Sequence, residues 1–207
     1  ASKGGVVPGV PYDSSADHLV AACEASLHRL GTDHLDLFQV HRPDVLTHPA
    51  EVARALETLV TSGKVRAVGV SNYSPTQVAA LVAHLQIPLA SVQPEFSPLA
   101  LEALADGTLD LAMQHRISVL AWSPLAGGRL GEPGNDAPAQ RVCAELDRQA
   151  QRCGVSRAAA TYAWILAHPA GIIPIVGSQQ PSRIREAATA YQVEWTRADW
   201  YRVLVAS

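Results

Sequence analysis

The stretch that decides the fold is Leu35-Asp36-Leu37-Phe38-Gln39-Val40-His41-Arg42-Pro43-Asp44. Its first six residues form a short, β-rich apolar run. Pro43 ends that run, because proline has no N–H to contribute to a sheet. We therefore expect His41 at the last position of a strand. In parallel α/β folds, ligands bind where the carboxyl ends of the strands meet. His41 is accordingly the first candidate for a chemical role.

The composition is that of an ordinary globular protein, and its charge argues against two classes of binding partner. The chain has 207 residues, 48% hydrophobic and 17% charged, with a formal net charge of −3. Because no basic run occurs, nucleic acids and anionic membrane surfaces are poor candidate partners. No apolar run approaches the about 20 residues of a membrane span. No signal peptide is visible, but the chain opens Ala1-Ser2-Lys3 without a methionine, so a targeting segment could have been lost. We expect a cytoplasmic location.

Cysteine and histidine spacing gives no support for a metal site. The cysteines fall in helical patterns without a Cys-x-x-Cys pair, so we expect free, buried or half-buried thiols in a reducing compartment. The histidines of the first 50 residues show no paired-ligand spacing, which makes a metal-dependent hydrolase a weak interpretation. These residues are Cys23, Cys143 and Cys153, and His18, His28, His34, His41 and His48.

Short apolar runs alternate with helical patterns along the whole chain. Such alternation predicts parallel strands joined by right-handed crossovers, in an α/β fold. No linker or low-complexity segment interrupts it, so we expect a single domain over residues 1–207. The predicted strands are 35–40, 67–70, 90–92, 117–121 and 172–176. The first predicted helix is capped by Ser14 or Ser15, runs to about Leu30 and is closed by Gly31. The other predicted helices are 50–62, one from Ser74-Pro75, 100–114, 139–153, 156–167, 181–191 and 197–205.

Polar side chains follow five successive predicted strands, which suggests one shared rim. Ser71 has the alternative role of capping the next helix, and Gln93 that of a satisfied core amide. Trp122 suits stacking on a flat heterocycle. Gly127 and Gly128 allow a phosphate to approach the backbone, although no Gly-x-Gly-x-x-Gly fingerprint occurs. The strand-end residues are His41, Arg42, Ser71, Asn72, Gln93, Glu95, Trp122, Ser123, Gly177 and Ser178.

Four ordered motifs resemble the aldo-keto reductase superfamily. They are 35–44, then Gly63-Lys64-Val65-Arg66-Ala67-Val68-Gly69-Val70-Ser71-Asn72-Tyr73, then Trp122-Ser123-Pro124-Leu125-Ala126-Gly127-Gly128-Arg129-Leu130, and last Ile175-Val176-Gly177-Ser178 followed by Pro181-Ser182-Arg183-Ile184-Arg185-Glu186. Their order and spacing agree over essentially the whole chain. The chain most resembles the bacterial branch with His-Arg-Pro after the fourth strand. The resemblance implies a (β/α)8 TIM barrel that transfers hydride between NADPH and a carbonyl or alcohol.

The resemblance also implies a catalytic tetrad of Asp, Tyr, Lys and His. His41 matches the tetrad histidine, and Lys3 in Ser2-Lys3-Gly4-Gly5 resembles the tetrad lysine at the end of the third barrel strand. A hydride that reaches a carbonyl carbon leaves charge on the oxygen, so an acid must supply a proton. In the family a tyrosine is that acid, and the lysine ammonium lowers its pKa.

The same resemblance assigns residues to the cofactor. Ser71, Asn72 and Gln93 are expected to hold the nicotinamide amide, and Trp122 to stack on its ring. Ser178 and Arg183 are expected at the adenosine 2′-phosphate, and Glu186 at the adenine. Gly177 stands where many members of the family have a basic residue, which weakens NADP preference and leaves NADH as an alternative. Ala187 stands where many have asparagine, which leaves one adenine contact unassigned. The pyrophosphate residues are Ser123, Leu125, Gly127 and Arg129, with Gly177 also on the cofactor side.

The tetrad tyrosine and aspartate have no convincing counterpart here. The chain is expected to begin at the third barrel strand, so the first two strands and first helix are missing and the segment alone is expected to be inactive. We expect structural or surface roles for Tyr12, Tyr73, Tyr162, Tyr191 and Tyr201. The complete protein is expected to reduce a small-molecule aldehyde or ketone. The alternative is a nucleotide-sensing or regulatory barrel subunit with little turnover.

Overall fold

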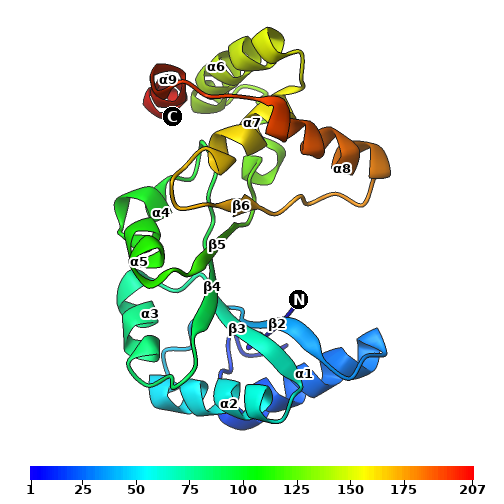
Figure 1. Cartoon of the computed structure of the whole chain (residues 1–207), viewed down its shortest axis with the longest axis vertical. Coiled ribbons are helices and arrows are strands. Elements are labelled where there is room, and N and C mark those ends of the chain that lie inside the picture. The colour runs from blue at the N-terminus through cyan, green and yellow to red at the C-terminus, as the bar shows by residue number, and fades with distance from the viewer. The chain divides into compact units, whose positions relative to one another are not determined.

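The computed structural model describes residues 1–207 and divides into two compact units. The first comprises Ala1–Pro94 and Asp110–Ser118, and the second comprises Glu95–Leu109 and Val119–Ser207. Each unit is built from parallel strands and helices that alternate along the chain, as the sequence predicts (Figure 1). No helix combines the length and apolar character needed to cross a membrane.

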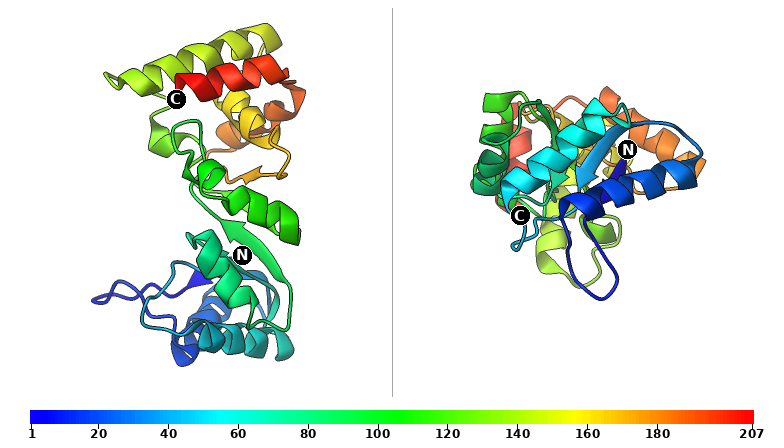
Figure 2. Two further views of the ribbon diagram at one scale, coloured as in Figure 1. Left: turned by 90° about the vertical axis from the view of Figure 1, so that its left-hand side faces the viewer. Right: turned by 90° about the horizontal axis from the view of Figure 1, so that it is seen from below.

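The first unit contains four parallel strands that pair in chain order. They are β1 (Ser2–Gly4), β2 (Leu35–Val40), β3 (Val65–Ser71) and β4 (Leu89–Gln93). Helix α1 (Ala16–Leu30) packs against β1 and α2, α2 (Pro49–Thr61) against β3, and α3 (Pro75–Val82) against α2. Figure 2 shows the connection between β1 and α1, in dark blue, extending away from the helices.

Local signals fix the ends of these helices. The Ser15 hydroxyl caps α1 by accepting from the backbone N–H of His18, and Gly31 ends the helix in the left-handed conformation with φ of 63°. Ser74 and Gln77 form a complete capping box at the start of α3, with Pro75 in its first turn. The expected starts of these helices are therefore confirmed.

The core of the first unit requires one close backbone approach. Phe38, Val68 and Leu56 are fully buried between the strands and the helices. A Cβ added to Gly69 in β3 would lie 2.1 Å from the hydroxyl of Ser91 in β4. Glycine at this position therefore lets β3 and β4 approach at the register the site needs.

The second unit holds β5 (Ser118–Ala121) apart from its first residue, and β6 (Ile173–Pro174), and the two strands are parallel. Its core includes an aromatic stack of Trp164 on Trp200, with ring centroids 4.5 Å apart. Each indole N–H donates at 3.0 Å to the backbone carbonyl of the other tryptophan. Its remaining elements are α4 (Glu102–Ala105), the 3₁₀ turn η1 (Ala126–Gly128), α6 (Ala137–Cys153), α7 (Arg157–Leu166), α8 (Pro181–Ala188), the 3₁₀ turn η2 (Thr189–Gln192) and α9 (Arg197–Ala206).

Three sequence predictions differ from the structure. The single helix expected over 100–114 is two, α4 and α5 (Thr108–His115), because Gly107 adopts a φ of 90° between them. The helix expected over 181–191 ends at Ala188 and continues as a 3₁₀ turn. The strand expected over 172–176 is only the dipeptide Ile173–Pro174, although the Ile175 N–H still donates to the Ala121 carbonyl of β5 at 2.9 Å.

The three cysteines are free thiols, as predicted. Cys23 and Cys143 are buried, and Cys153 is half-buried. Burial raises the pKa of the Cys23 thiol and that of the Cys143 thiol above 9.0. Both groups are therefore inert parts of the packing.

Candidate active site

The predicted residues of the first unit gather at the carboxyl ends of its strands. Lys3 lies in β1, Ser71 ends β3 and Gln93 ends β4. Ser71 and Gln93 are register partners in the sheet. Strand β2 ends at Val40 and not at His41, but the His41 N–H still donates to the Gly4 carbonyl at 2.8 Å. The structure thus brings this part of the expected rim together.

The Ser71 hydroxyl is the hub of a hydrogen-bond network. It donates to the backbone carbonyl of Gln93 at 3.0 Å. It accepts from Lys3 Nζ at 3.0 Å and from Asn72 Nδ2 at 3.1 Å. A hydroxyl has one donor and two acceptor positions, so all of its capacity is used. The cap expected as the alternative role of Ser71 belongs instead to Ser74.

Asn72 fixes the backbone where three strands end. It adopts a φ of 59°, a left-handed conformation that asparagine tolerates better than most residues. Its side-chain amide donates to the His41 carbonyl at 3.2 Å, and its backbone N–H donates to the Gln93 carbonyl at 3.1 Å. Asn72 therefore holds the backbone of His41 in place relative to β3 and β4.

Gln93 differs from the other buried glutamine of the sheet. The Gln39 amide donates to the Ser91 hydroxyl at 3.0 Å, which makes it a satisfied core group. The Gln93 residue is also mostly buried, with 6% exposed, but its amide is not among the fully enclosed polar atoms that lack a partner. An amide that is not committed to a core partner can bond a carboxamide ligand, which is the role expected of Gln93 toward the nicotinamide.

Burial and positive neighbours tune the two predicted catalytic residues. The pKa of Lys3 is lowered from 10.5, first by burial and then by the charge of Arg42. The pKa of His41 is lowered from 6.5 by burial, then by Lys3 and Arg42. The imidazole of His41 is therefore neutral near pH 7, which leaves one ring nitrogen as a donor and the other as an acceptor.

Neither the hydrogen bond of Lys3 nor the two shifted tyrosine pKa values indicates an activated phenol. Lys3 Nζ bonds to Ser71 and not to a phenol. Burial and, secondarily, the charge of Asp44 raise the pKa of Tyr73 above 10.0. Burial likewise raises the pKa of Tyr162. These phenols hold their protons more tightly than a free tyrosine does, contrary to what lysine activation produces.

The predicted pyrophosphate residues of the second unit form a tight turn after β5. The backbone is left-handed at Ser123 (φ 53°), Ala126 (φ 52°) and Gly127 (φ 65°). The Ser123 hydroxyl accepts from the Gly127 N–H at 2.8 Å. Arg157 bonds the carbonyls of 130 and 131 and forms an ion pair with Asp147. The turn is thus held in a shape that exposes backbone at Gly127.

The other predicted cofactor residues of this unit are more exposed. Trp122 is half-buried, and its backbone forms an isolated parallel β-bridge with the backbone of Glu95. Arg129 is exposed and paired with Asp136 at 2.7 Å, a contact that costs little to break in solvent. The Ser178 hydroxyl accepts from the Gln180 N–H at 3.2 Å. Exposed residues here are Gly127, Arg129, Gly177 and Arg183, and half-buried ones are Leu125, Ser178 and Glu186.

Helix α8 starts beside these residues without a side-chain cap. Its first turn carries no acid, and it includes Arg183. An uncapped helix N-terminus leaves backbone N–H donors and a partial positive charge. Together with a guanidinium, this donor set fits a phosphate group.

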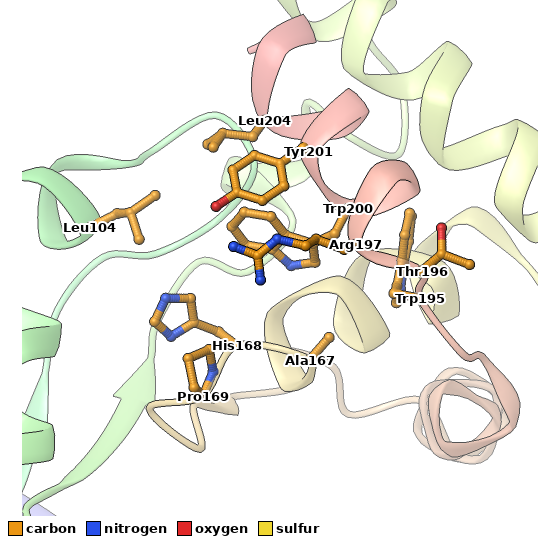
Figure 3. Close-up of a pocket in the computed structure, with 10 residues that line it drawn as sticks. All are labelled: Leu104, Ala167, His168, Pro169, Trp195, Thr196, Arg197, Trp200, Tyr201 and Leu204. Atoms are coloured by element: carbon orange, nitrogen blue, oxygen red, sulfur yellow. The ribbon is translucent and has the colours of Figure 1, made fainter.

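A separate cavity of about 560 Å³ lies within the second unit (Figure 3). Trp200, Tyr201 and Arg197 of α9 line one side, and His168 and Pro169 lie opposite. The Arg197 guanidinium lies 5.5 Å from the centre of the Tyr201 ring. None of the predicted site residues lines this cavity, so it is distinct from the strand-end rim. No group of three or more potential metal ligands occurs in the chain.

Comparison with known proteins matches essentially the whole chain. Residues 1–204 match the sequence profile of the aldo/keto reductase family. A 6-dehydroglucose reductase of Novosphingobium aromaticivorans is 54% identical over 207 residues, which are 100% of this chain and 68% of that protein. The oxidoreductase YdhF of Escherichia coli is 43% identical over 95% of this chain and 65% of its own length. The chain thus spans about two thirds of these relatives.

A solved structure confirms the fold prediction. The glycerol dehydrogenase from Gluconobacter oxydans is 27% identical and superimposes with a TM-score of 0.89, over 100% of this chain and 71% of that one. The expected α/β fold of the (β/α)8 type, of which this chain supplies a part, is therefore confirmed. The roles expected of individual site residues stay predictions.

Proposed function

Because the chain belongs to the aldo/keto reductase family, we propose that the complete protein reduces aldehydes or ketones to alcohols with NADPH, or alternatively NADH. The observation that carries this proposal is the network at the strand ends. Lys3, Ser71 and Asn72 are joined by hydrogen bonds of 3.0 and 3.1 Å, and Asn72 holds the His41 carbonyl. These are the residues that a carbonyl reductase of this family needs at one edge of its sheet.

His41 and Lys3 have distinct chemical roles in this proposal. A bound nicotinamide supplies the hydride. The neutral His41 imidazole donates a hydrogen bond to the substrate carbonyl, which orients it and stabilises the charge that develops on oxygen. The Lys3 ammonium, held by Ser71, contributes positive charge beside that oxygen and favours proton release from a neighbouring acid.

The residues present fit a nicotinamide dinucleotide. The Gln93 amide and the Asn72 amide suit the carboxamide. Ser71, whose hydroxyl capacity is used within the protein, contributes mainly by orienting Asn72 and Lys3. In the second unit we assign the ring contact to Trp122 and the adenosine 2′-phosphate to Ser178 and Arg183. We assign the pyrophosphate to Ser123, Leu125, Gly127 and Arg129, with Gly177 beside it, and the adenine to Glu186.

Two further parts of the proposal concern the residue that donates the proton and the class of substrate. We propose that the tetrad tyrosine and aspartate belong to a part of the protein outside this chain, and that the segment alone does not turn over. A small sugar-type aldehyde is the favoured substrate, supported by two relatives named 6-dehydroglucose reductase that are 54% and 41% identical. We also propose a cytoplasmic location, and a net charge of −3 without a basic run argues against nucleic-acid and anionic membrane partners.

The test measures NADPH absorbance at steady state with the complete protein and a panel of aldehydes. We expect reduction of small hydroxyaldehydes. His41→Ala should lower kcat by about 100-fold or more, with little change in NADPH affinity. Cofactor binding without oxidation across the panel would instead identify a nucleotide-sensing subunit. Equal kcat for the wild type and His41→Ala would remove His41 from the chemistry.

A further inference from the structure

Arg42 is a half-buried guanidinium without a protein partner. Only two arginines of the chain are half-buried, Arg42 and Arg157, and the rest are exposed. Arg157 is fully engaged, with two bonds to Asp147 and two to backbone carbonyls. Arg42 has no hydrogen bond or ion pair to any group of the chain. A guanidinium that gives up part of its hydration normally gains acceptors in return.

The nearest acid in the sequence is already used. Asp44 lies two residues after Arg42, but its carboxylate accepts from the Ser14 N–H at 3.0 Å. It also accepts from the Leu46 N–H at 3.0 Å and the Thr47 hydroxyl at 2.8 Å. Asp44 therefore ties the loop after β2 to the loop after β1 and leaves Arg42 unpaired.

The position of Arg42 places this free donor beside the proposed chemistry. It follows His41 directly, and its charge acts on both His41 and Lys3. Lys3 in β1 and the pair His41 and Arg42 just after β2 thus stand at the ends of two neighbouring strands of the first unit. Basic groups in such positions attract oxygen atoms that carry negative or partial negative charge.

We propose that Arg42 is a specificity-determining residue that donates hydrogen bonds to substrate oxygen atoms other than the reacting carbonyl. This inference rests on the proposed reductase function and adds to it the substrate class. The favoured substrates are aldehydes rich in oxygen acceptors, whether neutral hydroxyls or a carboxylate. Plain alkyl aldehydes lack the acceptors and gain nothing from Arg42. Arginine is suited to the task because its planar fork presents several N–H donors at once.

The test compares matched substrates in the complete enzyme. Glyceraldehyde and propanal share a three-carbon chain and differ in hydroxyl groups, and succinic semialdehyde adds a carboxylate. In Arg42→Gln, kcat/KM for glyceraldehyde should fall by about 10- to 100-fold while that for propanal stays within about threefold. A larger fall for succinic semialdehyde than for glyceraldehyde would identify an anion as the favoured acceptor. Arg42→Lys should recover only part of the loss.

Arg54 offers a matched control. It is exposed, lies in α2 of the same unit and has no ion pair, so Arg54→Gln should leave all three kcat/KM values unchanged. An equal fall for glyceraldehyde and propanal in Arg42→Gln, or no fall for either, would overturn the inference. An equal fall with a lower melting temperature would show that Arg42 pairs with an acidic group of the protein outside this chain. Absence of all wild-type turnover would instead refute the proposed function itself.

Discussion

The Lys3 ammonium donates a 3.0 Å hydrogen bond to the Ser71 hydroxyl, 68 residues further along the chain. Ser71→Ala removes that acceptor and the one used by Asn72 Nδ2, and leaves the Gln93 carbonyl without this donor. We expect the free energy of unfolding of the complete protein to fall by about 1–3 kcal/mol in urea denaturation. Ser62→Ala, at an exposed helix end, is the control and should cost less. Equal losses of unfolding free energy in Ser71→Ala and Ser62→Ala would contradict a central role of the Ser71 hydroxyl in the hydrogen-bond network.

The lowered pKa of His41 makes stability depend on pH in a defined window. Because the folded state binds this proton less tightly than the unfolded state, stability is retained above pH 6.5 and is lost as the pH falls from 6.5 toward the folded-state pKa. His41→Gln should lose less stability than the wild type between pH 8 and pH 5, in urea denaturation at each pH. The same loss in both proteins would argue against a buried, neutral imidazole.

Gly69 tolerates no side chain. In Gly69→Ala the new Cβ would lie 2.1 Å from Ser91 Oγ and 2.8 Å from the Ser91 carbonyl, so β3 and β4 must separate. We expect a loss of about 2–3 kcal/mol in the free energy of unfolding, measured by urea denaturation. Gly177→Ala is the matched control for stability, because nothing lies within 4 Å of its added Cβ. A neutral Gly69→Ala would mean that the strands readily adjust.

Asp199 anchors the start of α9. Hydrogen bonds from Thr196 and Arg152, with the charge of Arg202 nearby, lower its pKa below 3.8. Its contribution to stability is therefore present above pH 3.8 and is lost as the pH falls through the folded-state pKa. Asp199→Ala should cost about 1–3 kcal/mol at pH 7 by urea denaturation. Asp36→Ala, which removes an exposed pair with Arg66, should cost less than about 1 kcal/mol.

Local signals carried much of the fold prediction. The caps at Ser15 and Ser74, the stop at Gly31 and the strand before His41 all depend on residues close in sequence. One prediction failed where a single backbone angle decided the outcome. Gly107, with a φ of 90°, divides the predicted helix over 100–114. The last strand is also shorter than predicted, at two residues.

By itself, the sequence determined the alternating α/β order, the strand that leads to His41 and the family resemblance of its motifs. Only the tertiary structure decided how the site groups are partnered. The Ser71 hydroxyl is fully engaged, the Gln93 amide is not, and Asp44 serves two loops and leaves Arg42 unpaired. Local caps and turns form between neighbours in the chain. A polar group's partner depends instead on strand register and burial, which bring residues from distant parts of the chain together.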